Sequence, residues 1–249
     1  MVTFLLKKSY QLSNLKEVPF QDLWGSRGVF TTMRMIGKPP RLILLKPHLN
    51  NLLVSTKKYK IRKKNLKNII KDLIKKNCIY KGPDNLFRIA LNKKLISVSI
   101  RKRPKPKKNF KLLLFKYKRI EPSYKNLYYK KIISKMSKLD SSKFDIALVS
   151  NNKILETGTS NLVFIQNGKL YSPKENCYFG NTIKHINKKI KIIGKDISIN
   201  KIDDFDEILL IGSGKGITSV SKIDELNWNR KKNNIYKKVL RIYNKLLKL

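Results

Sequence analysis

The sequence predicts an α+β fold in two domains. Strand-like and helical segments follow one another along the 249 residues, of which 41% are hydrophobic, so the chain can build one large core or two modest ones. No internal repeat is visible, which argues against a solenoid. A proline-containing stretch at residues 118–123 has the composition of a linker. We therefore expect an N-terminal domain over residues 1–117, an interdomain hinge over 118–123 and a C-terminal domain over 124–249.

Two kinds of segment alternate in the N-terminal half. Runs rich in β-branched and aromatic residues predict strands, and apolar residues at helical spacing predict helices, the first with Pro47 in its opening turn. The predicted strands are 28–36, 41–45, 85–90, 95–100 and 110–117, and the predicted helices are 46–53 and 64–76. The strands at 85–90 and 95–100 form a hairpin, because a short polar turn joins them.

The C-terminal half follows the same logic. Three amphipathic segments predict helices, and short apolar runs bounded by turn residues predict strands. The predicted helices are 127–138, 182–192 and 235–247, and the predicted strands are 145–149, 153–156, 161–165, 169–171, 207–211 and 217–220. With the N-terminal half, these elements indicate two α+β domains and a cleft between them.

Composition excludes several classes of protein. The two cysteines, Cys78 and Cys177, lie far apart with no C-x-x-C or Cys/His spacing, so we expect neither a disulfide framework nor a metal site. No uncharged apolar run approaches the ~18 residues of a membrane span. We expect a cytoplasmic protein with no membrane partner.

The formal net charge of +41 raises the question of nucleic-acid binding. Only ten of the 57 basic residues are arginine, and lysine, isoleucine and asparagine are enriched in every segment, as an A+T-rich genome would produce. Nucleic acid is therefore not the expected partner. The cluster RKRPKPKK at 101–108 contains two prolines, which predict a solvated loop, and the alternative is an anion-binding arm.

Glu156 is an acid in an apolar setting. It lies between two hydrophobic runs, 154–155 and 162–164, in a chain with only 16 acidic residues. A carboxylate that enters a hydrophobic sheet needs a cationic partner to offset its desolvation. The alternative is an exposed turn acid that follows Lys153.

Seven short motifs stand in a characteristic order along residues 25–224. They are GVFTTMR at 28–34, HLNNL at 48–52, KNLYY at 125–129, FDIAL at 144–148, ETGTSNLVF at 156–164, GNT at 180–182 and GSGKGITSV at 212–220. Together they resemble the fold-type IV pyridoxal-phosphate enzymes, also called class IV aminotransferases, which include branched-chain and D-amino-acid aminotransferases and 4-amino-4-deoxychorismate lyase. The resemblance implies the two-domain D-amino-acid aminotransferase-like fold and pyridoxal 5'-phosphate as cofactor.

This resemblance assigns roles to three residues. Lys125 would attach the cofactor aldehyde and then transfer the substrate proton. Glu156 would face the pyridine nitrogen, so that the pyridinium is its missing cation. Thr32 would lie near the cofactor face and assist proton transfer during elimination of pyruvate. Alternatively, Lys125 is one surface lysine among 47, Glu156 is an exposed turn acid and Thr32 is an ordinary β-branched strand residue.

The cofactor phosphate needs donors, which the resemblance places in two glycine-containing turns. The first turn supplies Asn181 and Thr182, for which the alternative is an ordinary helix N-cap. The second supplies Ser213 and Gly214, for which the alternative is an ordinary hairpin turn. Asn161 would steady the loop that carries Glu156, and the alternative is an asparagine in an ordinary turn. One position departs from the family, because Asn51 stands where an arginine usually binds the phosphate. Lys184 could compensate if its side chain reaches that group.

The nearest resemblance is to the lyase, which releases 4-aminobenzoate and pyruvate from 4-amino-4-deoxychorismate for folate synthesis. The alternatives are a branched-chain or D-amino-acid aminotransferase and a basic relative without catalytic activity that binds anions or nucleic acid. The first two imply a small amine or amino-acid substrate. The family also implies a homodimer.

Overall fold

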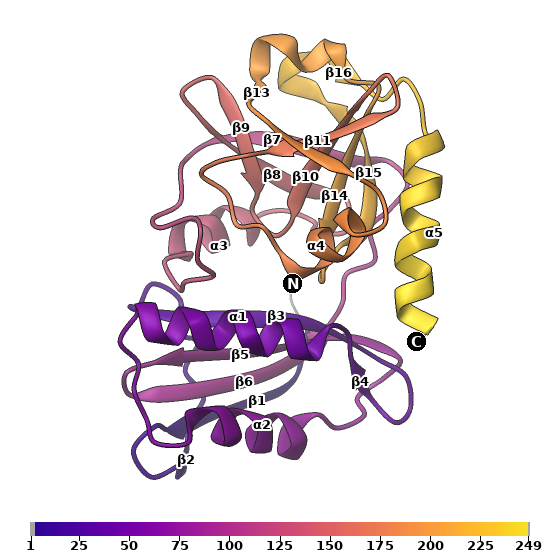
Figure 1. Ribbon diagram of the computed structural model, residues 1–249. Helices are drawn as coiled ribbons and strands as arrows, with labels where there is room; N and C mark the ends of the chain where they lie inside the picture. Colours follow the sequence, from indigo (N-terminus) through magenta and orange to yellow (C-terminus); the bar gives the residue numbers. More distant parts are fainter. Residues whose placement is uncertain (1–2, 249) are drawn as a thin grey trace. The chain divides into compact units, whose positions relative to one another are not determined.

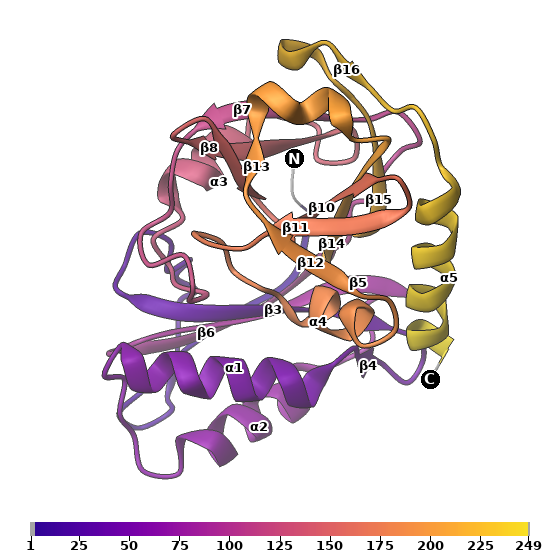
Figure 2. The same ribbon diagram turned by 45° about the horizontal axis from the view of Figure 1, so that its top comes forward.

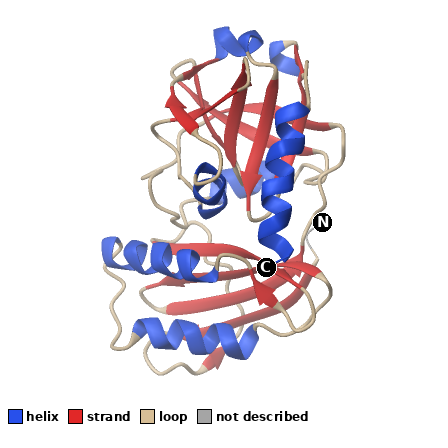
Figure 3. Cartoon of the chain, turned by 45° about the vertical axis from the view of Figure 1, so that its right-hand side comes forward, coloured by secondary structure: helices blue, strands red, loops and turns tan. Residues whose placement is uncertain are grey.

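The computed structural model describes residues 3–248 and divides into two compact units. The first unit comprises Met1–Arg103 and Tyr124–Lys130, and the second comprises Pro104–Ser123 and Lys131–Leu249. Each unit combines a β-sheet with helices (Figure 3). The α+β class predicted from the sequence is therefore confirmed.

The first unit is a six-stranded antiparallel sheet in the order β2-β1-β6-β5-β3-β4. Its strands are β1 (Phe4–Gln11), β2 (Glu17–Val18), β3 (Gly28–Ile36), β4 (Arg41–Leu42), β5 (Asp84–Asn92) and β6 (Leu95–Lys102). Two helices, α1 (Leu45–Lys58) and α2 (Leu66–Asn77), bury their apolar sides against one face of this sheet (Figure 1).

The alternation of side chains along β3 decides which residues face the helices. Val29, Met33 and Met35 are buried in the core cluster that contains the apolar residues of α1 and α2. Phe30 and Thr32 therefore point to the opposite face of the sheet. That second face is the one on which polar and cationic side chains collect.

The second unit contains a ten-stranded mixed sheet (Figure 2). Its strands are β7 (Phe110–Lys116), β8 (Phe144–Ser150), β9 (Lys153–Thr157), β10 (Asn161–Gln166), β11 (Lys169–Pro173), β12 (Ile192–Lys195), β13 (Ile197–Ser198), β14 (Glu207–Gly212), β15 (Gly216–Ile223) and β16 (Trp228–Asn229). Its helices are α3 (Lys130–Met136), α4 (Asn181–Asn187), α5 (Asn234–Lys248) and the short η1 (Ile199–Asp204) and η2 (Asp224–Leu226).

Both faces of the central strands β10 and β14 are covered. Val163 and Ile211 pack with α4 and α5 in one hydrophobic cluster, whereas Phe164 and Leu210 pack with Trp228 in another. This double burial explains why β10 and β14 read as continuous apolar runs. Within residues 3–248, no helix has both the length and the apolar character needed to cross a membrane.

The compact units divide the chain differently from the expected boundary at residue 117. Strand β7 belongs to the second sheet, because it pairs in parallel with β8 and β15. Conversely, Tyr124–Lys130 belongs to the first unit, because its backbone pairs with the start of β3. Parallel partners far apart in sequence leave no local signal, so composition alone missed this exchange of segments.

Several predicted elements have different bounds in the structure. The strand predicted over 41–45 is only β4, because Leu45 already opens α1. The helix predicted over 127–138 is only α3, and the helix predicted over 182–192 ends at Asn187, with Ile192 opening β12 instead. Arg101 and Lys102, predicted to lie in a loop, are the last residues of β6. The prolines that follow, at 104 and 106, keep the rest of that cluster out of the sheet.

Candidate active site

Lys125 lies in a short extended segment that runs beside the first residues of β3. The backbone N–H of Phe30 donates to the carbonyl of Lys125 at 3.0 Å, and the N–H of Leu127 donates to the carbonyl of Gly28 at 2.9 Å. A side chain at Gly28 is not tolerated, because a Cβ there would lie 2.2 Å from the Leu91 carbonyl oxygen. Close backbone pairing therefore fixes the position of Lys125.

The Lys125 side chain is half-buried beside an aromatic ring and a neutral imidazole. Its Nζ lies 5.1 Å from the centre of the Phe30 ring. Burial lowers the pKa of His48 to about 3, and the positive charge of Lys125 adds to that shift. The environment is partly desolvated, which is where a lysine amine acts as a nucleophile or base.

Thr32 lies on the face of the sheet that carries Phe30, two residues further along β3. Its side chain is half-buried and makes no hydrogen bond to the residues that the structure describes. In the antiparallel register of β3 and β5, Thr32 stands directly opposite Arg88. A hydroxyl and a guanidinium are thus neighbours on this face.

Arg88 and Arg101 were not predicted as site residues. Arg88 is 7% exposed, pairs with Asp22, and its guanidinium lies 4.5 Å from the centre of the Trp24 ring. Its Nε is buried and has no hydrogen-bond partner in residues 3–248. Burial lowers the pKa of Arg101 to about 10, and the charge of Arg88 adds to that effect. Two cations with one carboxylate between them leave an excess of positive charge on a sheet face, which suits an anionic ligand.

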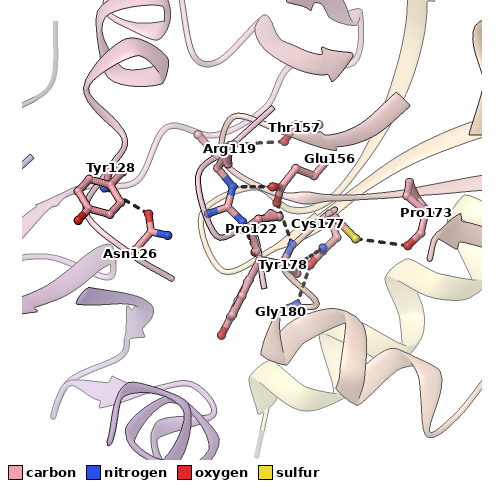
Figure 4. Close-up of polar contacts among 12 residues, drawn as sticks. Arg119, Pro122, Asn126, Tyr128, Glu156, Thr157, Pro173, Cys177, Tyr178 and Gly180 are labelled. Carbon is pink, nitrogen blue, oxygen red and sulfur yellow. Dashed lines mark hydrogen bonds and ion pairs between the residues drawn. The ribbon is translucent and has the colours of Figure 1, made fainter. Parts of the chain in front are cut away.

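In the second unit, Glu156 is buried on β9 with 4% exposure, as predicted (Figure 4). Its Oε1 accepts a hydrogen bond from Nε of Arg119 at 2.5 Å, and its Oε2 accepts one from the backbone N–H of Tyr178 at 3.2 Å. Burial raises the pKa of the neighbouring Cys177 thiol to about 12, and the charge of Glu156 adds to the shift, so this thiol is not nucleophilic at neutral pH.

The cation beside Glu156 differs from the one predicted. From the sequence, a cofactor pyridinium is the expected cation, whereas the structure provides Arg119, from the segment predicted as a hinge. Nothing local distinguishes Arg119 from the surrounding basic residues, because the pair joins positions that are far apart in the sequence. The buried charge is therefore compensated within the protein itself.

Asn161 fastens the loop that precedes α4. Its Nδ2 donates to the Tyr178 carbonyl, and its Oδ1 accepts a hydrogen bond from the Gly180 N–H at 3.0 Å. Since the Tyr178 N–H also donates to Glu156, the loop at 178–180 is held by both Asn161 and Glu156. Asn181 and Thr182 follow as the first two residues of α4, with 7% and 3% exposure.

Ser213 and Gly214 occupy the tight turn between β14 and β15 and are half-buried. Beside this turn, a Cβ at Gly212 would lie 2.9 Å from the Oγ of Ser160, and that buried hydroxyl has no hydrogen-bond partner within the described chain. An orphaned hydroxyl next to a glycine turn fits an oxyanion such as a phosphate. Asn51 on α1 is half-buried, and Lys184 on α4 is exposed.

Asp145 organises the turn at 158–160 that separates Glu156 from Asn161. Its buried carboxylate accepts hydrogen bonds from Thr159 Oγ1 at 2.5 Å, from Thr157 Oγ1 at 3.3 Å and from the Ile146 N–H at 2.8 Å. Burial raises the pKa of Asp145, and the positive charge of Lys215 opposes that shift. These bonds fix the turn that joins β9, which carries Glu156, to β10, which carries Asn161.

Comparison with known proteins gives a family and a fold. The sequence profile of the family described as amino-transferase class IV matches residues 28–223, whereas no curated protein matches the chain. The branched-chain aminotransferase of the thermophilic archaeon Thermoproteus uzoniensis, solved with norvaline, has a TM-score of 0.77 at 16% identity, over 100% of this chain and 96% of that chain. An aminotransferase from Brucella abortus bound to the cofactor PLP has a TM-score of 0.77 at 15% identity, over 98% of this chain and 99% of that chain.

A third solved structure agrees with these two. The PLP-bound form of a hypothetical aminotransferase from Mycobacterium tuberculosis has a TM-score of 0.73 at 14% identity, over 97% of this chain and 98% of that chain. Identities of this size show a shared fold. The profile match carries the family, since residues 28–223 are well over half of the 249 residues. The chain therefore belongs to the class IV aminotransferases, a family of pyridoxal-phosphate-dependent enzymes.

Proposed function

We propose that this enzyme is a lyase that converts 4-amino-4-deoxychorismate to 4-aminobenzoate and pyruvate. The observation that carries the proposal is the opposed pair of Thr32 and Arg88 on one sheet face, beside Phe30 and the Lys125 amine. The substrate is a dicarboxylate with one amine. Arg88 and Arg101 suit its carboxylates, and an uncommitted Thr32 hydroxyl suits a proton transfer that accompanies loss of pyruvate.

The proposal assigns the following roles to the remaining residues. Lys125 attaches the cofactor and later takes up the substrate proton, and Glu156 faces the ring nitrogen. When bound, pyridoxal phosphate supplies an electron sink for the substrate. The proposed contacts of the cofactor phosphate and its loop are Asn161, Asn181, Thr182, Ser213 and Gly214. The orphaned Ser160 hydroxyl supports this placement of the phosphate.

Product analysis tests the proposal. Purified enzyme loaded with pyridoxal 5'-phosphate should release pyruvate and 4-aminobenzoate in equal amounts from 4-amino-4-deoxychorismate, with no keto acid added. Lys125→Ala should abolish both this activity and the near-ultraviolet to visible absorption of the attached cofactor. Release of 4-aminobenzoate that strictly requires a keto acid would overturn the lyase assignment.

The second candidate is an amino-acid aminotransferase, and a specific observation favours it. The solved structures named above are aminotransferases, one of them a branched-chain enzyme that covers the full length of this chain. In that case Lys125 would hold the cofactor and transfer the proton of the amino-acid substrate, whose amino group would pass to the cofactor as the keto acid is released. Turnover of a branched-chain or D-amino acid that depends on 2-oxoglutarate would select this candidate.

The same proposal includes a homodimer, since the family implies one. Light scattering coupled to gel filtration tests this with the loaded enzyme. A mass near twice the 29.1 kDa of the chain is expected. A mass that stays at the value of one chain over a range of protein concentrations would contradict it.

A further inference from the structure

Arg119 and Glu156 form a buried ion pair in the second unit. Their side chains are 1% and 6% exposed, and Nε of Arg119 lies 2.5 Å from Oε1 of Glu156. Charges this deeply buried are costly to desolvate and are retained where geometry and hydrogen bonding compensate them. Charge compensation alone leaves open why this carboxylate is so tightly oriented.

Both partners of the ion pair are held by backbone groups as well. Nη2 of Arg119 donates to the Pro122 carbonyl at 2.6 Å, and the Tyr178 N–H donates to Oε2 of Glu156 at 3.2 Å (Figure 4). The guanidinium thus links the carboxylate to the chain three residues before Lys125. The carboxylate is in turn held on each oxygen by a different donor.

Arg119 and Tyr178 bind different oxygens of Glu156, through the Arg119 Nε and the Tyr178 N–H. A carboxylate has about four lone-pair directions and accepts from several N–H donors at once. A ring N–H donor can therefore share this carboxylate with Arg119. The ring nitrogen of a pyridinium is a donor of that kind.

We propose that Arg119 is a positioning residue, which holds the Glu156 carboxylate ionised and oriented for the cofactor ring nitrogen. This inference rests on the proposed function, in which Glu156 faces that nitrogen. Without the guanidinium, a carboxylate on a side chain that is 6% exposed is more stable with a proton, and a neutral acid does not favour a protonated ring. Arginine suits the task because it stays charged when buried and donates in a fixed fork, which lysine does not.

A cofactor analogue isolates this effect. 1-Deazapyridoxal 5'-phosphate carries a C–H group in place of the ring nitrogen, so the ratio of its dissociation constant to that of pyridoxal 5'-phosphate reports the contact with Glu156. The ratio is measured by absorbance and fluorescence titration of the full-length apoprotein. The variants are Arg119→Gln, Arg119→Lys, Glu156→Gln and the double variant Arg119→Gln/Glu156→Gln.

The matched control is Arg103→Gln. Like Arg119, Arg103 is a largely buried arginine in an ion pair: its side chain is 8% exposed and pairs with Asp84. It belongs to the first unit. A general loss of stability should weaken the binding of both cofactors and leave the ratio unchanged. Arg103→Gln should therefore keep the wild-type ratio.

For Arg119→Gln we expect the ratio of the two dissociation constants to fall about tenfold or more, and for Arg119→Lys we expect a smaller fall. The double variant should have the same ratio as Glu156→Gln, because both changes remove the same contact. If Arg119→Gln does not fold, the ratio for Arg119→Lys decides in its place. A wild-type ratio in the arginine variants, or losses that add in the double variant, would overturn the role of Arg119. A wild-type protein that binds both compounds equally would instead refute the role of Glu156 in the proposed function.

Discussion

Thr31 and His48 form a buried hydrogen bond, with 2.7 Å between Oγ1 and Nδ1, that joins β3 to α1. Both side chains are almost fully buried, at 3% and 5% exposure. The pKa of His48 is lowered to about 3 by burial and by the nearby Lys125 charge, so the imidazole is neutral in the folded protein at neutral pH. The helix is thus fastened to the strand that carries Thr32 by an uncharged pair.

The first prediction concerns stability against pH. An unfolded histidine takes up a proton near pH 6.5, whereas folded His48 does so only near pH 3, so the unfolded state gains protons first as pH falls between these values. Stability is lost in that window and is unaffected above it. Between about pH 7 and about pH 4.5 the wild-type protein should lose about 2 to 3 kcal/mol more than His48→Gln. Urea unfolding of both proteins at the two pH values measures the difference, and equal losses would contradict it.

The second prediction concerns the missing arginine at position 51. Asn51 on α1 is half-buried, and an arginine there restores the charged phosphate contact that the family resemblance implies. Asn51→Arg should bind pyridoxal 5'-phosphate about 10- to 100-fold more tightly, as one charge-assisted contact allows. Its neighbour Asn50 is exposed, so Asn50→Arg adds the same charge to the same helix as a control. Equal gains in the two variants would mean that only net charge matters.

Secondary structure was predictable where one pattern dominated. The strand predicted at 28–36 has the bounds of β3. Buried Thr31, Met33 and Met35 alternate there with the half-buried residues between them, and β-branched and aromatic residues fill the first half. Strand β1 was missed because Lys7 and Lys8 interrupt its apolar run, and the edge strand β13 is only two residues long. Short edge strands depend on their partners and leave little periodicity.

The candidate site was predictable only in part. The burial of Glu156 followed from its apolar flanks and is confirmed, since an acid between two buried strands has few alternatives. Its partner Arg119 and the pair of Arg88 and Arg101 come from segments whose charge resembles the rest of a lysine-rich surface. Contacts between distant positions depend on tertiary structure, and for Arg88 and Arg101 on the register of β5 against β6, which a single sequence does not specify.

The third prediction concerns recognition of a carboxylate by Arg88. Its side chain is held against Trp24 and pairs with the exposed Asp22, so replacing Arg88 leaves no buried carboxylate without its cation. Arg88→Gln should raise KM for the carboxylate substrate by about 10- to 100-fold and change kcat less, since a charge-assisted bond is lost in the bound state. Steady-state kinetics of the loaded enzyme measures both constants. The exposed Arg62→Gln is the control, and a KM that Arg88→Gln leaves unchanged would remove Arg88 from the substrate site.

The fourth prediction concerns Asp145 as the support of the 158–160 turn. Asp145→Ala removes an acceptor of Thr157 and of Thr159, and it removes the carboxylate charge that interacts with Lys215, which is 4% exposed. We expect a loss of about 3 kcal/mol in unfolding free energy, because buried hydrogen bonds are lost and the buried Lys215 charge loses a compensating carboxylate. Cofactor affinity should fall as well, since the turn separates Glu156 from Asn161.

Two comparisons separate a specific effect of Asp145 from a general one. Asp145→Asn keeps the size of the side chain and one acceptor oxygen, so it should lose less stability than Asp145→Ala. Asp140→Ala removes an exposed acid that bonds Ser142 and pairs with Lys143 in the turn before β8, and it should leave the unfolding free energy almost unchanged. Urea unfolding of the apoproteins and cofactor titration measure the two effects. If Asp145→Ala matched Asp140→Ala in both, the 158–160 turn would hold its shape without the buried carboxylate, and Asp145 would have no part in the orientation of Glu156.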